Sequence, residues 1–359
     1  MTLLAALALA AWLYLALFRG RFWRAAPAAL PRPVGGDVTA VIPARDEEAT
    51  IGRTVRSLAR QGVPVLVVDD ASRDATASAA RGAGAEVLTG AALPEGWTGK
   101  LWALEQGVRR VTSEWVLLTD ADIEHHATSV GELLTLAEDE DLDMASLMVR
   151  LHCDSVPERL MIPAFVWFFA LLYPFAWVAE PERRTAAAAG GCILIRRAAL
   201  ERIGGFAAIS DALIDDCALA AKVKESGGRI WLGLSDGTAS LRRYPRLADI
   251  WRMVTRTAYT QLDYSPAKLA GTLVGLGALF LVPPLAFLFA EGWARLLGLA
   301  AWALMAGLYW PMLRFYRLSP LWAPLLPLTS LVYLGATLDS ARRHWEGKGG
   351  EWKGRVRRS

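Results

Sequence analysis

Cysteine is scarce in this sequence, with three residues among 359, at Cys153, Cys192 and Cys217. The three stand far apart and show none of the short spacings of metal-binding cysteines. Their odd number does not suit a disulfide framework and indicates free thiols in a reducing compartment. We therefore expect all three to be small core residues.

Charge is nearly absent from the long apolar runs, with Arg295 as the exception. Transport paths usually place ionisable groups inside such runs, so the pattern does not favour a transporter. The whole chain is 54% hydrophobic, too apolar for an ordinary soluble enzyme, yet 21% of its residues are charged. Both figures fit a soluble domain joined to membrane segments. The net charge of +3 is small and by itself says nothing about nucleic acid. No nucleic acid partner is expected.

The N-terminal segment lacks the order of a secretory signal, because its positive charges follow the apolar run instead of preceding it. Residues 3–18 are almost wholly apolar, and Arg19, Arg21 and Arg24 come next. Residues 1–24 are therefore expected to form an uncleaved transmembrane anchor. By the positive-inside rule, the N-terminus lies outside and these arginines lie in the cytoplasm.

A second apolar stretch, residues 160–179, is long enough to cross a membrane but contains Pro163 and Pro174. A crossing here would separate Asp120 and Asp122 from the α/β-like sequence that follows. Its tryptophans and phenylalanines suit the membrane interface. We expect an interfacial or buried helix.

Three more apolar runs, residues 269–290, 293–313 and 321–338, make residues 266–340 a C-terminal transmembrane region, followed by a basic tail at 341–359. If all three runs crossed the membrane, the basic tail would finish outside, against the positive-inside rule. One run is therefore expected to be re-entrant or interfacial. Residues 321–338, with Pro324 and Pro327, are the candidate.

Residues 37–265 are expected to form one domain, in which strand-like and helix-like stretches alternate to about Leu241. The apolar strand patterns lie at 38–43, 65–68, 86–88 and 116–118, and the helical patterns lie between them at 47–61, 75–81 and 100–111. This alternation predicts an α/β fold with a parallel, doubly wound sheet. Such sheets bind ligands at the carboxyl ends of their strands.

Asp120 and Asp122 follow the strand at 116–118 and are separated by one residue. Two carboxylates so placed can face one ion, and their hard oxygen atoms suit Mg²⁺ or Mn²⁺. A metal there would bridge a nucleotide diphosphate. An Asp-x-Asp pair alone is weak evidence, because most such pairs are solvated loop or cap residues.

Polar groups also follow the strands at 38–43 and 65–68. Asp69 and Asp70 can accept hydrogen bonds from a nucleotide base or ribose, while Ser72 or Asp74 can cap the next helix. In the loop that starts at Pro43, Asp46 and Glu48 form a wall of the nucleotide pocket, or else the acids of this loop complement a helix N-terminus.

Two further loops carry charge at a helix start. Gly96-Trp97-Thr98-Gly99-Lys100 combines two glycines with a lysine, which favours phosphate contact over a solvated side chain. In the loop 211–216, Asp215 and Asp216 precede an amphipathic helix. They serve as caps or supply the base that removes an acceptor proton.

Five motifs in this order and spacing resemble a family 2 glycosyltransferase with the GT-A fold, over about residues 37–265. They are Pro43 with Asp46 to Glu48, Asp69-Asp70-x-Ser72-x-Asp74, Asp120-Ala121-Asp122, Gly190 to Arg197 with Ile203 to Phe206, and Asp215-Asp216. The Gly-Trp-Thr-Gly-Lys loop and the flanking membrane segments are similar to hopanoid-associated glycosyltransferases, with carotenoid-acid and ceramide glycosyltransferases as cousins. That resemblance implies a bacterial plasma (inner) membrane protein, multi-pass, with a cytosolic catalytic domain.

The resemblance implies a role for each matching residue. Asp69 and Asp70 would contact the base and ribose of a UDP-sugar, beside Pro43, Asp46 and Glu48, and Lys100 would meet the diphosphate. Asp120 and Asp122 would hold Mg²⁺ or Mn²⁺. Asp216, the second acid of its pair with Asp215, would be the base of an inverting transfer.

Two features depart from the family pattern. The acidic pair is Asp-Asp where Glu-Asp is usual. The Gln-x-x-Arg-Trp motif of processive members is absent, and Trp251-Arg252 and Arg256 occupy its region, where the arginines would grip the leaving UDP. Its absence predicts transfer of a single sugar.

The expected function is transfer of one sugar from a UDP-sugar to a membrane lipid, with a hopanoid as the suspected acceptor and the bilayer as a partner. One alternative acceptor is a polyprenyl phosphate. An alternative of another class is a catalytically silent membrane scaffold, against which the intact Asp120, Asp122 and Asp216 count.

Overall fold

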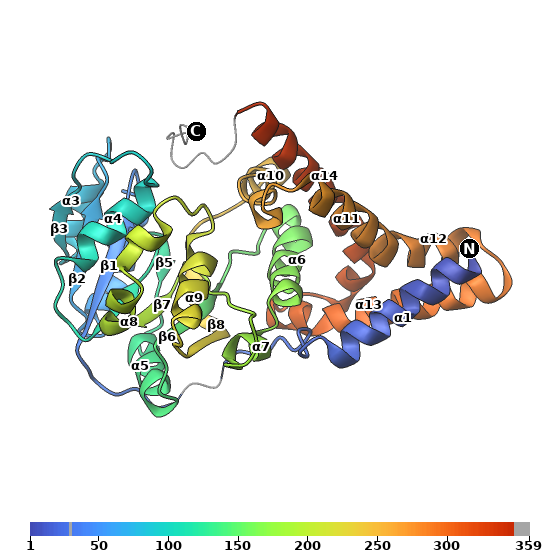
Figure 1. The fold of residues 1–359 in the computed structure, drawn as a ribbon, viewed down its shortest axis with the longest axis horizontal. Helices are drawn as coiled ribbons and strands as arrows, with labels where there is room; N and C mark the ends of the chain where they lie inside the picture. The colour runs from blue at the N-terminus through green and yellow to red at the C-terminus, as the bar shows by residue number, and fades with distance from the viewer. Residues whose placement is uncertain (29–30, 348–359) are drawn as a thin grey trace.

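Eight strands form one sheet in the computed structural model, which describes residues 1–28 and 31–347 (Figure 1). They are β1 Val38–Ala44, β2 Val65–Asp69, β3 Glu86–Thr89, β4 Trp115–Leu118, β5 Ile123–Glu124, β6 Met144–Arg150, β7 Ile193–Arg196 and β8 Ile230–Ser240, in the order β3-β2-β1-β4-β7-β6-β8-β5. The predicted α/β fold class is confirmed. The sheet is mixed rather than wholly parallel, because β7 runs antiparallel between β4 and β6.

Helices cover both faces of the sheet. They are α2 Ile51–Ala59, α3 Thr76–Gly82, α4 Gly99–Val108, α5 Ser129–Asp139, α8 Arg197–Arg202 and α9 Asp215–Glu225, with the 3-10 helix η1 Gly205–Ile209. Side chains alternate between faces along a strand, so Val41 packs with α4 and α9 while its neighbour Ile42 packs with α2 and α5. The predicted doubly wound arrangement follows from this alternation.

The core on the face of the sheet that contains the Val41 side chain continues into the apolar helices. Helix α6 (Val156–Leu172) is followed by α7 (Phe175–Ala179). Helix α6 packs against α10 (Leu247–Thr255), α13 (Gly292–Phe315) and α14 (Leu326–Trp345). Trp167 of α6 is fully buried, donates a hydrogen bond from Nε1 to the Leu308 carbonyl at 3.1 Å, and lies 6.1 Å from Trp12 between ring centroids. Residues 160–179 therefore join the sheet to the apolar bundle as a buried, packed segment.

The bundle contains three stretches that are long and apolar enough to cross a membrane: Pro266–Phe289, Gly292–Phe315 and Pro320–Trp345. Their elements are α11 Pro266–Leu276, the π-helix η3 Gly277–Leu281, α12 Val282–Phe289, α13 Gly292–Phe315, the 3-10 helix η4 Pro320–Leu325 and α14 Leu326–Trp345. The N-terminal helix α1 (Thr2–Phe18) packs against α12 and α13. The predicted C-terminal apolar helices are therefore present; residues 348–359 of the predicted basic tail lie outside the described residues.

Both ends of the η4–α14 segment lie at the end of the apolar bundle that is next to the α/β domain. Just before η4, the Tyr316 ring lies 5.8 Å from the guanidinium carbon of Arg150 at the end of β6. At the other end, Trp251 of α10 (Leu247–Thr255) donates a hydrogen bond to Asp339 at 2.9 Å. Between these ends, Trp302 in the middle of α13 bonds the Pro324 carbonyl at 3.2 Å. The segment thus enters the bundle to about half the length of α13 and turns back.

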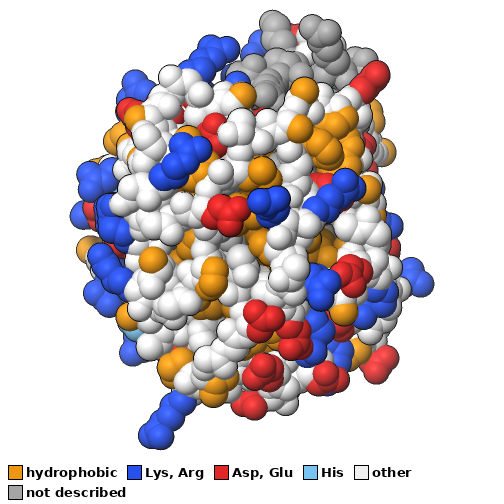
Figure 2. Space-filling model, turned by 90° about the vertical axis from the view of Figure 1, so that its left-hand side faces the viewer, with side chains coloured by type: hydrophobic (Ala, Val, Ile, Leu, Met, Phe, Trp, Pro, Cys, Tyr) orange, Lys and Arg blue, Asp and Glu red, His pale blue; other side chains and the backbone are white. Residues whose placement is uncertain are grey.

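The face of the α/β domain that points away from the apolar helices is polar. Figure 2 shows Lys, Arg, Asp and Glu side chains of both signs scattered over it, with apolar side chains between them. The large exposed apolar side chains gather instead on the bundle, where Phe289, Trp293 and Leu321 are 78%, 74% and 80% exposed. This division is typical of a water-facing domain attached to lipid-facing helices.

The cysteines are free thiols, as expected. Cys192 and Cys217 are buried as predicted, whereas Cys153 is only half-buried.

Candidate active site

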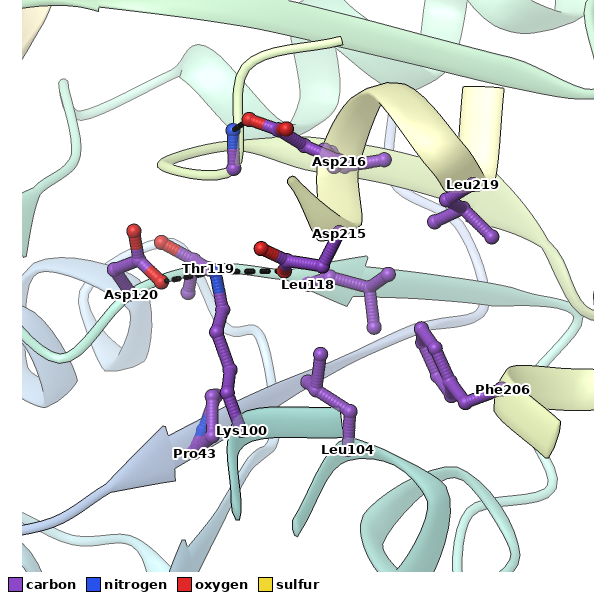
Figure 3. A pocket seen from close by; sticks show the side chains of 12 residues that line it. Pro43, Lys100, Leu104, Leu118, Thr119, Asp120, Phe206, Asp215, Asp216 and Leu219 are labelled. Carbon is purple, nitrogen blue, oxygen red and sulfur yellow. Dashed lines mark hydrogen bonds and ion pairs between the residues drawn. The ribbon is translucent and has the colours of Figure 1, made fainter. Parts of the chain in front are cut away.

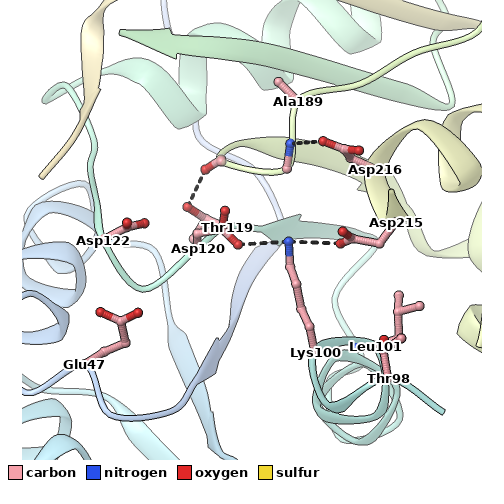
Figure 4. Close-up of polar contacts among 12 residues, drawn as sticks. Glu47, Thr98, Lys100, Leu101, Thr119, Asp120, Asp122, Ala189, Asp215 and Asp216 are labelled. Carbon is pink, nitrogen blue, oxygen red and sulfur yellow. Dashed lines mark hydrogen bonds and ion pairs between the residues drawn. The ribbon is translucent and has the colours of Figure 1, made fainter. Parts of the chain in front are cut away.

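Acidic side chains gather where β1, β2 and β4 end. The three strands run parallel, with Val41 beside Leu118 and Ala44 beside Asp69. Their carboxyl ends therefore meet at one edge of the sheet, and the residues that follow them come together there. The structure brings together the predicted groups at Asp46 and Glu48, Asp69 and Asp70, and Asp120 and Asp122, and Figure 4 shows the last pair.

Lys100 forms the centre of the site. Thr98 caps the start of α4, where its side chain accepts a hydrogen bond from the Leu101 backbone, so Lys100 lies in the first turn. Its Nζ atom lies 3.0 Å from Asp120 Oδ1 and 2.9 Å from Asp215 Oδ2 (Figure 3). Burial acts to lower the pKa of Lys100, but Asp120, Asp215 and Asp216 outweigh it and raise the pKa. The ammonium group therefore stays charged.

Asp216 occupies the first turn of α9. It faces the turn formed by Gly190 and Gly191, which we call the glycine turn. One of its carboxylate oxygens accepts a hydrogen bond from Gly190 N at 2.8 Å, and the other accepts one from Cys217 N at 2.8 Å. Burial, followed by the charge of Asp215, raises the pKa of Asp216 to about 6, against an opposing effect of Lys100. A carboxylate with such a pKa is ionised at neutral pH and still basic enough to accept a proton.

The glycine at position 190 leaves open the space between these charged groups. A Cβ atom there would lie 3.2 Å from Lys100 Nζ and 3.4 Å from Asp216 Oδ2. Apolar side chains line the other side of this space, and Figure 3 shows Leu104, Phe206 and Leu219 around it. Lys100 and Asp216 therefore line the same small space.

Two residues that the sequence did not single out hold the glycine turn. Thr119, which follows β4, donates its hydroxyl proton to the Gly191 carbonyl at 2.7 Å. Burial lowers the pKa of His125 to about 3, so the imidazole is neutral. Its Nε2 lies 2.9 Å from the Thr119 hydroxyl and donates to it, because that hydroxyl has no second proton. Nothing in their spacing distinguishes them from ordinary loop residues.

Asp122 does not share a cation with Asp120. Its Oδ2 atom lies 2.7 Å from Nε of Arg242, and Nη2 of the same arginine lies 2.8 Å from Glu47 Oε1. Arg242 and Glu47 were not among the predicted site residues, although Glu47 lies within the matching motif Asp46 to Glu48. No motif in the sequence marks Arg242, which lies two residues after the end of β8.

The pair Asp120 and Asp122 fits a hard dication in the chemistry of its oxygen atoms. The described residues contain no group of three His, Cys, Asp or Glu side chains that could hold a metal alone. Mg²⁺ is commonly held by one or two carboxylates, with substrate phosphates and water as the other ligands. The two aspartates thus suit a cation that arrives with a phosphate-bearing substrate.

The loops after β1 and β2 are joined by hydrogen bonds. Asp46 accepts a hydrogen bond from Arg73 N at 2.8 Å, and Glu48 accepts one from Ala75 N at 2.8 Å. Asp74 accepts a hydrogen bond from Thr76 N at 3.0 Å at the start of α3, but the N-cap position of that helix is Ala75 and not the predicted Ser72 or Asp74. Asp46 and Glu48 therefore act across the two loops rather than on the helix that follows them.

Asp69 and Asp70 are 8% and 4% exposed at the end of β2. Among the described residues, the buried Oδ1 atom of Asp69 has no hydrogen-bond partner. A buried carboxylate oxygen left without a donor is costly, and a bound N–H or O–H group would satisfy it. Pro43 lines the pocket beside Lys100.

Of the two predicted arginines, Arg252 belongs to α10 and Arg256 directly follows it. Arg252 is exposed and pairs with Asp249 at 2.5 Å. Burial raises the pKa of Tyr244, and among the smaller effects Arg256 acts to lower it, together with Arg242. Arg256 therefore lies near Tyr244, in the segment that follows β8.

Residues 39–204 match the family model described as "Glycosyl transferase family 2", so the chain carries a domain of that family. Curated proteins from several Staphylococcus aureus strains, including USA300, match over 89 residues at 40% identity; their name is "4,4'-diaponeurosporenoate glycosyltransferase". The match covers 24% of this chain and 24% of those relatives, about a quarter of their length.

Two solved structures are similar over 64% of this chain. One is glucosyl-3-phosphoglycerate synthase from Mycobacterium tuberculosis with Mn²⁺ and uridine-diphosphate-glucose, at 20% identity, a TM-score of 0.43 and 79% of its own chain covered. The other is mannosyl-3-phosphoglycerate synthase from Rubrobacter xylanophilus, at 19% identity, a TM-score of 0.39 and 76% covered. Both likenesses are distant.

Proposed function

We propose that this chain is a membrane-bound glycosyltransferase that moves one sugar from a UDP-sugar to a membrane lipid with inversion. The observation that carries the proposal is the cluster at the strand ends. A partly buried carboxylate, Asp216, faces the same small space as a permanently charged lysine, Lys100, within a chain that carries a family 2 domain.

On the donor side, the nucleotide would lie at the carboxyl ends of β1 and β2. The orphan oxygen of Asp69 would accept a hydrogen bond from the uracil or the ribose, with Asp70 beside it. Lys100 would place its charge on the diphosphate. A metal ion held by Asp120 and Asp122 would supply Lewis-acid stabilisation of the departing diphosphate.

On the acceptor side, Asp216 would take the proton of an acceptor hydroxyl. The oxygen then forms a bond to the anomeric carbon, while the bond from that carbon to the β-phosphate oxygen breaks and its electron pair leaves with UDP. Attack from the face opposite the leaving group inverts the configuration. The two backbone N–H groups that bond Asp216 hold its carboxylate toward the space beside Gly190.

We propose that the acceptor is a membrane lipid, and the first candidate is the hydroxyl group of a hopanoid. The continuous core that joins the sheet to the apolar helices through α6 supports delivery along a membrane surface. The hopanoid assignment rests on the similarity of the Gly-Trp-Thr-Gly-Lys loop and of the flanking membrane segments. The name of the Staphylococcus relatives makes a carotenoid acid the second candidate, and a polyprenyl phosphate is the third.

We also propose that η4–α14 is re-entrant and that the protein lies in the bacterial plasma membrane with its α/β domain in the cytosol. Both ends of this segment lie beside the α/β domain, which supports a topology with crossings by α1, by α11 with α12, and by α13. The C-terminus then lies inside, as its basic residues favour.

This topology predicts opposite sides for the two termini. A protease-cleavable tag at the C-terminus should be cut in inside-out vesicles and protected in right-side-out ones. A tag placed between Phe289 and Gly292, where α12 meets α13, should behave in the opposite way, as should an N-terminal tag. A C-terminal tag that is cut only from outside would show that α14 crosses the membrane.

The proposed function is tested by mass-spectrometric lipid profiling of a deletion strain and its parent. A glycosylated hopanoid should disappear on deletion and return with the wild-type gene. Loss of a glycosylated carotenoid acid or polyprenyl phosphate instead would keep the enzyme class and change the acceptor. If no glycolipid changes and the purified full-length protein in nanodiscs does not bind UDP with Mn²⁺, the scaffold alternative replaces the enzyme.

A further inference from the structure

Each aspartate of the pair Asp120 and Asp122 is held by its own cation. Lys100 bridges Asp120 to Asp215, and Arg242 bridges Asp122 to Glu47. Four carboxylates and two cations therefore face one another across the strand ends. The two cations differ in one respect: Lys100 begins a helix inside the site, whereas Arg242 lies on an extended segment at its rim.

The backbone around Arg242 is firmly placed. Leu241 N donates to the Asp122 carbonyl at 2.7 Å, which continues the pairing of β8 with β5. Two residues after Arg242, Tyr244 N donates a hydrogen bond to Glu158 Oε1 at 2.6 Å, at the capped start of α6. The main chain of Arg242 is therefore fixed on both sides, and only its side chain is free to move.

The side chain itself remains accessible. It is 40% exposed, whereas the side chains of Glu47 and Asp122 that it bridges are 13% and 11% exposed. A guanidinium has a planar fork that matches carboxylate and phosphate oxygens equally well. It can therefore exchange one anion for the other by a change of rotamer.

We propose that Arg242 is a diphosphate-binding residue that Asp122 and Glu47 hold in place until a nucleoside diphosphate and a divalent cation arrive. The proposal rests on the proposed function, because it takes Asp120 and Asp122 as the place where the cation binds. In the ligand-free site, Arg242 neutralises Asp122 and competes with any cation for its oxygen atoms. When the cation takes Asp122, the guanidinium turns to the diphosphate and keeps Glu47 as its second partner.

A purely structural role for Arg242 makes a different prediction. If the arginine only held two loops together, its loss would loosen Asp122 and weaken the binding of cation and nucleotide alike. If it is an exchangeable counter-ion, its loss frees Asp122 for the cation and removes a contact from the diphosphate. The two affinities then change in opposite directions.

The test uses the full-length protein in nanodiscs and the Arg242→Gln variant. Free Mn²⁺ is measured by electron paramagnetic resonance without nucleotide, and UDP binding is measured by calorimetry at saturating Mn²⁺. We expect Mn²⁺ alone to bind the variant more tightly by about threefold or more, because a competing charge is gone. UDP should bind it about 10- to 100-fold more weakly, as for a lost hydrogen bond to a charged group. Arg243→Gln, an exposed neighbour, is the matched control and should change neither affinity.

The outcomes separate the two proposals. Weaker Mn²⁺ and weaker UDP binding together, or unchanged UDP binding, would overturn the exchange and leave the proposed function intact. If the wild-type protein binds neither Mn²⁺ nor UDP, the proposed function itself is wrong. Arg242→Lys is the second variant, because it keeps the charge but cannot bridge two carboxylates as a fork; it should restore part of the UDP affinity. Failure of lysine to restore any affinity while Mn²⁺ binding is unchanged from wild type would count against the exchange.

Discussion

Asp216→Asn is expected to slow sugar transfer to a hydroxyl acceptor by about 10²- to 10⁴-fold, the usual contribution of a general base, with donor affinity nearly unchanged. Asparagine has the same shape, and its amide oxygen can still accept the hydrogen bond from Gly190 N. It cannot accept the acceptor proton. Steady-state kinetics of the purified full-length protein measure the change, with UDP binding by calorimetry as the second readout.

The same carboxylate sets the pH dependence. With the pKa of Asp216 raised to about 6, transfer by the wild-type protein should rise with pH through 6 and level off above it. Stability should follow the opposite slope. The native state binds this proton more tightly than the unfolded state, whose carboxyl titrates near 3.8, so the free energy of unfolding falls as the pH rises from about 4 to 6. The asparagine variant should lose this contribution.

Asp211→Asn, an exposed carboxylate in the loop before α9, is the matched control and should keep nearly full activity. A variant at position 216 that retains a tenth or more of wild-type transfer to a hydroxyl acceptor would contradict its assignment as the base. An acceptor that is already ionised needs no base. A small effect of Asp216→Asn with a carotenoid acid, beside a large one with a hopanoid, would therefore still agree with the mechanism.

Lys100→Met is expected to weaken UDP binding by about 10- to 100-fold, since a hydrogen bond to a charged group is lost, and to destabilise the protein as well. Methionine keeps much of the length of the side chain but leaves Asp120 and Asp215 without their cation. Breaking a buried ion pair costs about 3–5 kcal/mol. Because the Asp120 side chain is 37% exposed, we expect a loss at or below about 3 kcal/mol.

A second substitution separates the two effects of Lys100. Asp215→Asn added to Lys100→Met removes one of the two uncompensated carboxylates, so thermal stability should recover in part while UDP affinity stays low. Lys222→Met, which removes an exposed pair with Glu225, is the control and should cost no more than about 1 kcal/mol. If stability and UDP affinity recover together in the double variant, Lys100 has only a structural role.

The candidate site could be located from the sequence because its parts obey a local rule. Parallel strands that follow one another through helices place their carboxyl ends on one edge, so the polar residues after β1, β2 and β4 had to lie close together. Lys100 and Asp216 could be found in the same way, since each occupies a helix start. The division between a polar domain and apolar helices follows from composition alone.

The partners of these groups could not be found from the sequence. Arg242 and Asp122 are 120 positions apart, and Thr119 and the carbonyl of Gly191 are 72 positions apart. No spacing rule links residues at such distances, because their meeting depends on how strands order themselves in a sheet. The antiparallel entry of β7 between β4 and β6 decides that the glycine turn faces Asp216.

For the apolar runs too, the sequence determines one part of the structure and the tertiary contacts decide another. Length and hydropathy determined which segments suit a membrane, and the charge pattern predicted that one of them turns back. Only the tertiary contacts of Tyr316, Trp302 and Asp339 fix the course of η4–α14. Hydrophobic burial is non-directional, so it selects the segments that leave water, whereas hydrogen bonds and ring contacts between distant residues decide how those segments lie.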